Sequence, residues 1–299
     1  MHAGRVGASL AAAAARAGWP VAAVSRRALP DAERVAGRVR AAVGPAEDGA
    51  ARAEGPLATS DPERVVEAAD VVFLTTRDDG IAEVAAALAF RPGQIVAHCS
   101  GAMPLSTLAP AAARGAAVAG FHPLQTFPDE EGATRFRGIT FGIEAADAEA
   151  RATLERLAED LGGRVVALDA ATRPLYHAAA VLAGPLVAGL AGVAGELWSG
   201  LGRDRRGGLE ALAPLLVATA EGVAAAGVPD AMTGPFVRGD VEPVRAHLAA
   251  LADRPATRRA YAALALAQLP IARERGNIPD ARHDELLALL RGALDERDS

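Results

Sequence analysis

The first half of the sequence alternates between short apolar runs and longer segments with helical periodicity. Residues 71–75 form a continuous apolar run of the kind that a parallel sheet buries on both faces. Strands that alternate with helices predict an α/β fold built on a doubly wound parallel sheet. The expected strands are residues 21–24, 57–59, 71–75, 94–98, 117–121, 139–143 and 165–168, and the expected helices are residues 5–17, 31–43 and 147–161, with another starting at Asp61.

After Asp169 the alternation stops and helical patterns continue. This change predicts two domains, one with the sheet at residues 1–169 and an all-helical one at residues 170–299. The expected helices are residues 172–200, 208–226, 241–253, 256–275 and 280–296.

One uncharged run, residues 178–195, approaches the length of a membrane-spanning helix. It consists mostly of Ala and Gly and contains Pro185, so its drive toward membrane insertion is weak. We therefore expect a helix buried at the centre of the helical domain, with membrane insertion as the less favoured alternative.

A glycine pattern stands at the start of the first expected helix. Gly4 and Gly7 occupy the second and third positions of a G-x-G-x-x-G dinucleotide fingerprint, and His2 replaces the first glycine. Gly4, Arg5, Val6 and Gly7 would place backbone N–H groups around a pyrophosphate at the helix N-terminus. Too few residues precede this loop to build the central strand of such a sheet. We expect a missing or stunted central strand, and a chain start that was assigned too late or a natural protein that begins upstream.

Three polar residues, Ser25, Arg26 and Arg27, follow the expected strand at residues 21–24. An acidic residue at this point would bond a ribose 2′-hydroxyl, whereas arginine suits a 2′-phosphate. The sequence therefore favours NADP over NAD as cofactor. The alternative interpretation is a pair of surface arginines that only close a loop.

Polar residues also end the expected strands at 71–75, 94–98 and 117–121, at the edge where doubly wound sheets bind ligands. A lone histidine is more simply structural, but His98 and His122 close neighbouring strands, and together they favour a functional site. The expected contacts of the cofactor at these ends are Thr75, Thr76, His98, Ser100 and Gly101, and Gln125 follows His122 as a candidate for substrate binding.

Two polar sites interrupt the helical half. Tyr176 and His177 open the long apolar helix, and Arg238 and Asp240 lie in a polar loop, residues 233–240. The simplest interpretation of Arg238 and Asp240 is a loop ion pair, with Asp240 capping the following helix. The functional interpretation is a clamp for a carboxylate substrate.

The residue inventory limits the chemistry. The sequence contains no lysine, which excludes a P-loop lysine and a Schiff base, so acid–base chemistry must rest on histidine, carboxylate or tyrosine. The single cysteine, Cys99, excludes an intramolecular disulfide and fits a reducing compartment. We interpret Cys99 as a small buried filler rather than a nucleophile paired with His98, because adjacent strand residues point to opposite faces.

The net charge of −6 and the lack of a basic block argue against nucleic acid as a partner. The sequence opens with no charged-then-apolar leader, so we expect a cytoplasmic protein that is not secreted.

Four runs carry a resemblance to a known family: HCSGA at 98–102, FHPLQTF at 121–127, LYHAAAV at 175–181 and TGPFVRGD at 233–240. Over nearly the whole chain, the sequence resembles a family of bacterial Rossmann-like proteins with a C-terminal helical domain of unknown function. This family is similar to the group of pyrroline-carboxylate reductases, 6-phosphogluconate and hydroxyisobutyrate dehydrogenases, and ketopantoate reductases. The resemblance implies an NADP-linked reductase whose helical domain also builds a homodimer.

The sequence departs from that family at two positions. His2 replaces the first glycine of the loop, and Pro185 stands where the family usually has an asparagine. In the related dehydrogenases a lysine and an asparagine of this helix polarise the substrate carbonyl, and His177 is the natural replacement here. The expected reaction is hydride transfer between NADPH and a small carbonyl or imine acid, such as a ketopantoate-like one. His177 or His122 would donate the proton, and Tyr176 or Gln125 would orient the substrate.

Two other classes of function stay open at this point. The departures at His2 and Pro185 favour a non-catalytic NADP(H)-binding sensor or scaffold, since function belongs to the site and not to the fold. A hydrolase that uses His98 or His122 is the third class. No Asp/Glu-x-x-His spacing supports it, and we expect no metal site.

Overall fold

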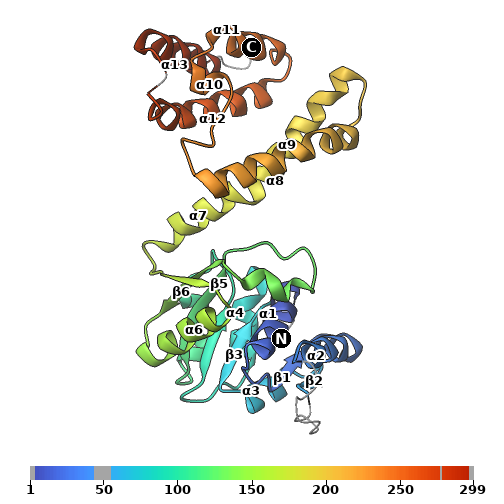
Figure 1. Ribbon diagram of the computed structural model, residues 1–299. Coiled ribbons are helices and arrows are strands. Elements are labelled where there is room, and N and C mark those ends of the chain that lie inside the picture. Colours follow the sequence, from blue (N-terminus) through green and yellow to red (C-terminus); the bar gives the residue numbers. More distant parts are fainter. Residues whose placement is uncertain (1–3, 44–54, 277, 296–299) are drawn as a thin grey trace. The chain divides into compact units, whose positions relative to one another are not determined.

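The computed structural model describes residues 4–43, 55–276 and 278–295 (Figure 1). The chain forms two compact units, Met1–Pro185 and Leu186–Ser299. We expected the division after residue 169. The first unit extends beyond that point because α7 (Arg173–Ala183) is attached to its sheet by buried polar contacts.

The first unit contains a five-stranded sheet in sequential order and a separate parallel pair. The sheet consists of β3 (Val71–Leu74), β4 (Ile95–His98), β5 (Ala117–Pro123), β6 (Thr140–Ala145) and β7 (Arg164–Ala167), and the pair consists of β1 (Ala23–Ser25) and β2 (Leu57–Thr59). The expectation of parallel strands is wrong at one place, because β5 and β6 are antiparallel, with His122 opposite Gly142. The segment between them carries only the 3-10 turn η3 (Gly132–Phe136) and no helix long enough to return the chain for a parallel pairing.

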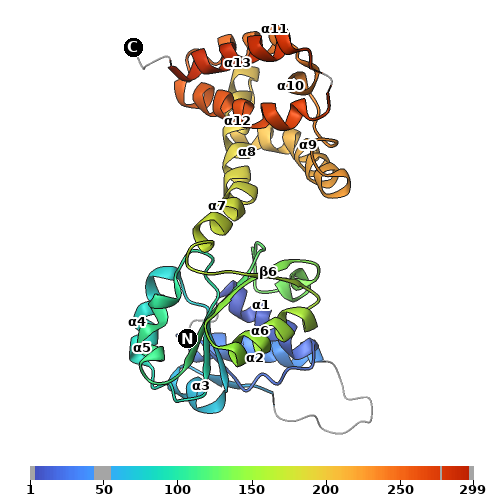
Figure 2. The same ribbon diagram turned by 90° about the vertical axis from the view of Figure 1, so that its left-hand side faces the viewer.

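Helices cover both faces of this sheet, which confirms the doubly wound α/β fold. One face packs against α1 (Arg5–Arg16) and α6 (Ala148–Asp160) in a core rich in aromatic rings, including Phe121, Phe136 and Phe141. The other face packs against α3 (Glu63–Ala68), α4 (Ile81–Ala87) and α5 (Ala109–Ala112) through aliphatic side chains. Figure 2 shows α4 and α5 on one side of the strands and α1 and α6 on the other. Helix α2 (Leu29–Val43) packs against α1 and the β1–β2 pair, and the short turns η1 (Asp78–Gly80) and η2 (Leu105–Leu108) complete this unit.

A cavity of about 780 Å³ separates β1 from β3. Residues 21–25 line one side and residues 70–73 the other, while Leu10 of α1 and Leu157 of α6 contribute apolar walls. Among the described residues no strand lies between β1 and β3, so the structure shows the gap that we expected at the centre of the sheet. Residues 1–3, including the His2 departure, lie outside the described residues.

The described residues of the second unit fold into helices. These are α8 (Pro185–Leu197), η4 (Trp198–Leu201), α9 (Arg205–Ala226), α10 (Pro235–Arg238), α11 (Val241–Ala250), α12 (Pro255–Arg273) and α13 (Asp280–Asp295). The single helix expected over residues 172–200 is broken at Gly184, because Pro185 has no N–H to continue the ladder and begins a new helix. The expected polar loop at 233–240 contains α10, whose Phe236 and Val237 are buried.

The apolar run at 178–195 is not the buried centre that we expected. The core of the second unit is formed by α10 to α13, and α8 and α9 leave large apolar side chains such as Leu190 and Leu215 exposed in the single chain. By length and composition, residues 173–201 and α9 each qualify as a membrane span, and both windows are almost unburied. Two such helices are weak evidence for a membrane protein.

Candidate active site

The carboxyl ends of β3, β4 and β5 lie side by side, and the N-terminus of α1 packs on the end of β3. A Cβ atom on Gly4 would lie 3.4 Å from the Thr75 carbonyl oxygen just after β3, so the loop packs closely on the strand end. Gly4 is the N-cap of α1, no side chain caps this helix, and its first turn contains no acidic residue. The N–H groups of the first turn and the helix dipole are therefore suited to an anion.

Three predicted catalytic residues converge beside these strand ends. His122 ends β5, and its Nδ1 is 2.7 Å from the Tyr176 hydroxyl oxygen on α7. The His122 and His177 rings are 6.5 Å apart between centroids. The structure thus brings His122, Tyr176 and His177 into one half-buried cluster, although α7 follows β5 by about 50 residues in the sequence.

Burial keeps the hydrogen-bonded pair uncharged near neutral pH. Burial is the main cause that lowers the pKa of His122 to about 4, and the nearby His177 and Arg173 lower it further. Burial also raises the pKa of Tyr176 to about 12, against the opposing influence of Arg173 and a backbone hydrogen bond at Gly142. A neutral imidazole therefore faces a neutral phenol, and a single hydrogen bond joins His122 Nδ1 to the Tyr176 hydroxyl.

Glycines make this cluster possible. A Cβ on Gly101 would lie 2.8 Å from His177 Cδ2 and 2.9 Å from His122 Cε1. A Cβ on Gly142 would lie 2.8 Å from Tyr176 Cζ, and one on Gly120 would lie 2.5 Å from the Arg173 guanidinium. These distances are shorter than ordinary van der Waals contact, so each glycine is required by a side chain of the cluster.

Sequence reasoning missed Arg173 and Glu144. Arg173 is only 2% exposed, and its Nε donates to Glu144 Oε2 on β6 at 2.6 Å, while Nη1 donates to the Ser100 carbonyl oxygen at 3.3 Å. The guanidinium therefore joins the start of α7 to β6 and to the end of β4. The sequence feature that could have predicted this pair is Glu144, an acidic residue in the mainly apolar run 139–145, since a charge in a buried strand needs a partner of opposite charge.

His98 lies in the interior, and the neighbouring Cys99 is partly buried against the aromatic core. The His98 side chain is fully buried rather than on the surface of the site, where we expected it to contact the cofactor. Burial, and then the Arg173 charge, lower its pKa to about 4. Burial raises the pKa of the Cys99 thiol to about 12, which agrees with its interpretation as a filler.

The remaining expected cofactor residues are spread along the same edge. Arg5 Nη1 donates to the Pro128 carbonyl oxygen at 2.9 Å. Ser100 Oγ accepts hydrogen bonds from the backbone N–H groups of residues 102 and 103 and so shapes the turn after β4. Ser25 is buried, Arg27 is exposed, Val6 packs on the aromatic core, Gly7 lines the cavity beside β1, and Thr76 contacts Gly80.

The expected substrate residues do not all belong to one unit. Gln125, just after β5, is exposed and accepts a hydrogen bond from the Thr126 N–H. Arg238 and Asp240 lie in the second unit and form an ion pair at 2.7 Å. Asp240 precedes α11 but makes no side-chain capping hydrogen bond, because its carboxylate faces Arg238 instead. Over the described residues, no group of three or more His, Cys, Asp or Glu side chains is placed to hold a metal ion.

Two family models match the chain in tandem. The Rossmann-like domain matches residues 1–123, and the Domain of unknown function (DUF2520) matches residues 139–268. The chain is a Rossmann-like protein with a DUF2520 domain. The motif run at 98–102 lies within the first match, the run at 121–127 crosses its end, and Tyr176 and His177 lie within the DUF2520 match.

Solved structures share this fold over almost the full chain. A Bacteroides fragilis protein assigned as an NADP oxidoreductase, BF3122, is 26% identical, with a TM-score of 0.68 over 90% of this chain and 96% of that one. Protein TM1727 from Thermotoga maritima is 20% identical (TM-score 0.63, coverage 99% and 98%). The 1-pyrroline-5-carboxylate reductase of Streptococcus pyogenes is 11% identical (TM-score 0.55, coverage 99% and 96%). No curated protein matches the sequence.

The lowered pKa values of His98 and His122 predict a pH-dependent stability of the first unit. The unfolded chain takes up protons below pH 6.5, and the folded chain does so only near pH 4, so the free energy of unfolding should fall as the pH drops from 6.5 to 4. For the fully buried His98 the shift corresponds to about 3 kcal/mol. Urea unfolding of the Trp198→Phe variant, followed by Trp19 fluorescence, measures it.

The variant His98→Gln should flatten this pH dependence even if it lowers stability overall, because glutamine does not titrate. His283→Gln in the second unit is the control and should leave the slope unchanged. An unaltered slope in His98→Gln would show that the imidazole is not held neutral.

Gly101→Ala should destabilise the first unit by about 1–3 kcal/mol, because the added Cβ overlaps both histidine rings. The matched control is Gly37→Ala in α2, where the nearest atom to an added Cβ is 3.8 Å away, and a gain of about 0.5–1 kcal/mol is expected. Thermal unfolding reported by Trp19 compares the two. Equal effects would contradict the close packing at Gly101.

Proposed function

We propose that this protein is an NADP-dependent oxidoreductase that acts on a small carbonyl or imine acid. The observation that carries the proposal is the His122–Tyr176 hydrogen bond beside His177, at the sheet edge that also presents the uncapped N-terminus of α1. A proton-managing cluster beside a site for a phosphate is the arrangement that hydride transfer from a dinucleotide needs. The similarity to the Bacteroides fragilis protein supports this proposal.

The residues present fit NADP. The close approach of Gly4 to the Thr75 carbonyl leaves a glycine-lined turn whose N–H groups suit a pyrophosphate. Arg26 follows β1, the position that reads the ribose 2′ substituent in such sheets, and its buried Nε has no hydrogen-bond partner. We therefore favour NADP over NAD.

Bound NADPH supplies the hydride, and the chain supplies position and a proton. The neutral Tyr176 hydroxyl can donate a hydrogen bond to a substrate oxygen or nitrogen while His122 fixes its orientation. With a pKa of about 4, His122 is unprotonated at neutral pH, which argues against our expectation that it donates the proton. We assign that role to His177, and the proton reaches the substrate heteroatom directly or through the Tyr176 hydroxyl.

Two residues are the candidates for substrate binding. Gln125 lies just beyond His122 in the chain, and Arg238 is the candidate for the substrate carboxylate, provided that it exchanges its ion pair with Asp240 for that anion. The fold of a pyrroline-carboxylate reductase supports a cyclic imine acid as one substrate class, with a ketopantoate-like oxo acid as the other.

The exposed apolar faces of α8 and α9 support a homodimer formed through the helical domain. Leu190 and Leu215 are 47% and 63% exposed in the single chain, and such contiguous apolar surface is typical of a subunit interface. We propose that a second copy covers these helices, that the protein is cytoplasmic, and that neither a membrane nor a nucleic acid is its partner.

His177→Gln should lower the rate of NADPH oxidation with small oxo acids or cyclic imines about a hundredfold, because it removes the general acid. Tyr176→Phe should act in the same direction. The matched control is Tyr261→Phe, which removes an equivalent hydrogen bond of 2.8 Å to His247 in the second unit and should leave the rate unchanged. NADPH binding without turnover of any such substrate would instead favour the sensor class.

Leu190→Glu and Leu215→Glu should convert the dimer to a monomer, because each places a charge in the apolar interface. Size-exclusion chromatography with light scattering measures the mass, with the exposed Leu29→Glu of the first unit as control. A wild-type protein that is monomeric, or that is recovered with the membrane fraction, would refute this assembly.

A further inference from the structure

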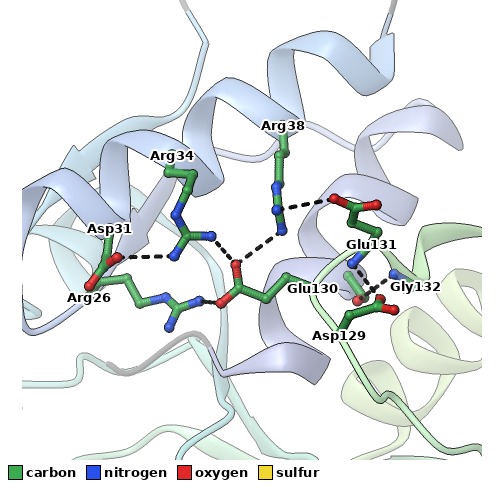
Figure 3. Close-up of polar contacts among 9 residues, drawn as sticks. Arg26, Asp31, Arg34, Arg38, Asp129, Glu130, Glu131 and Gly132 are labelled. Atoms are coloured by element: carbon green, nitrogen blue, oxygen red, sulfur yellow. Dashed lines mark hydrogen bonds and ion pairs between the residues drawn. The ribbon is translucent and has the colours of Figure 1, made fainter.

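Three arginines of the first unit converge on one carboxylate. Arg26 follows β1, and Arg34 and Arg38 lie one turn apart on α2 (Figure 3). Arg26 and Arg34 each bond one oxygen of Glu130, and Arg38 Nη1 donates to Oε2 at 3.1 Å. Glu130 belongs to the segment between β5 and η3 and is far from all three arginines in sequence.

The segment that carries Glu130 crosses the start of α1. Arg5 of the glycine turn donates to the Pro128 carbonyl oxygen, and the Gly132 N–H donates to Ser9 Oγ at 3.1 Å. Glu130 therefore reaches the arginines from a strap that is anchored beside the phosphate-binding turn on both sides.

The site offers more positive charge and more donors than Glu130 satisfies. Two outer acids, Asp31 and Glu131, share Arg34 and Arg38, but their side chains are 52% and 77% exposed, whereas Glu130 is 18% exposed. Burial raises the pKa of Glu130, yet the hydrogen bonds from Arg34 and Arg26 outweigh it and hold the carboxylate ionised. The buried Arg26 Nε makes no hydrogen bond. A phosphomonoester brings a second negative charge and a third oxygen to such a set of guanidinium forks.

We propose that Arg26, Arg34 and Arg38 form the site for the 2′-phosphate of NADP, and that Glu130 holds this site in the cofactor-free protein and leaves when the phosphate binds. This inference rests on the proposed function, since it assigns one end of the same cofactor. Glu130 then sets the cofactor preference. The dianionic 2′-phosphate displaces the monoanionic carboxylate, whereas a ribose 2′-hydroxyl does not.

Calorimetric binding of adenosine 2′,5′-bisphosphate (2′,5′-ADP) and 5′-AMP, which differ only in the 2′-phosphate, tests the site without any chemistry at the nicotinamide. The wild-type protein should bind 2′,5′-ADP roughly tenfold or more tightly than 5′-AMP. Glu130→Gln should tighten 2′,5′-ADP by a further tenfold or so and leave 5′-AMP unchanged, because the competing charge is gone. Arg34→Gln should abolish the preference. Glu33→Gln, which removes an exposed carboxylate from the helix that carries Arg34 and Arg38, is the matched control and should change neither affinity.

Three outcomes would overturn the proposal. If Glu130→Gln weakens 5′-AMP and spares 2′,5′-ADP, then Glu130 is an acceptor for a ribose hydroxyl. If it lowers the melting temperature without altering either affinity, as Glu130→Asp would then also do, the cluster is only a structural brace. If neither nucleotide binds, there is no nucleotide site here. A preference for 2′,5′-ADP in a protein that oxidises no NADPH would refute the proposed reductase activity but not this site.

Discussion

The buried guanidinium of Arg173 is the contact on which the rest of the site depends. It joins α7 to Glu144 on β6 and to the turn after β4, so a helix from the DUF2520 part of the chain is fixed to the sheet edge. Breaking a buried ion pair leaves an uncompensated charge in the interior, which costs about 3–5 kcal/mol. Burial is the main cause of the lowered pKa of His98 and of His122, and the Arg173 charge lowers both further, so one interaction fixes the position of α7 and helps to keep both imidazoles neutral.

Close approach at glycines is the second requirement. Gly101 follows β4, whereas Gly120 and Gly142 lie within β5 and β6, and a Cβ on each would lie closer than van der Waals contact to Arg173 or to a ring of the cluster. The HCSGA run is therefore a packing motif as much as a chemical one: His98 fills the interior and Gly101 makes space for His122 and His177. Tight packing of this kind holds the polar rings in fixed positions, which a general acid needs.

The gap between β1 and β3 gives the strap with Glu130 an additional role. Where a central strand would hold the two halves of the sheet together, the described residues instead connect them through α1, through α6 and through the ion pairs from Arg26, Arg34 and Arg38 to the strap. The arginine cluster is thus both a link across the divided sheet and the part of the molecule best suited to a phosphate. In our proposal, Glu130 neutralises these arginines in the free protein and the 2′-phosphate does so in the bound protein.

The sequence alone was enough for the fold class and for most helices and strands, because local periodicity is read directly from residue order. It also singled out His122, Tyr176 and His177, and the structure brings these three side chains together. It did not reveal the antiparallel β6, the break at Gly184 or the exposed α8 and α9, since these depend on what packs against each element. It also placed His98 at the ligand surface, although the side chain is buried. Arg173 with Glu144, and the three arginines with Glu130, join residues far apart in the chain. Only the tertiary structure decided those pairs, because a buried charge takes its partner from whatever the fold brings within a few ångströms.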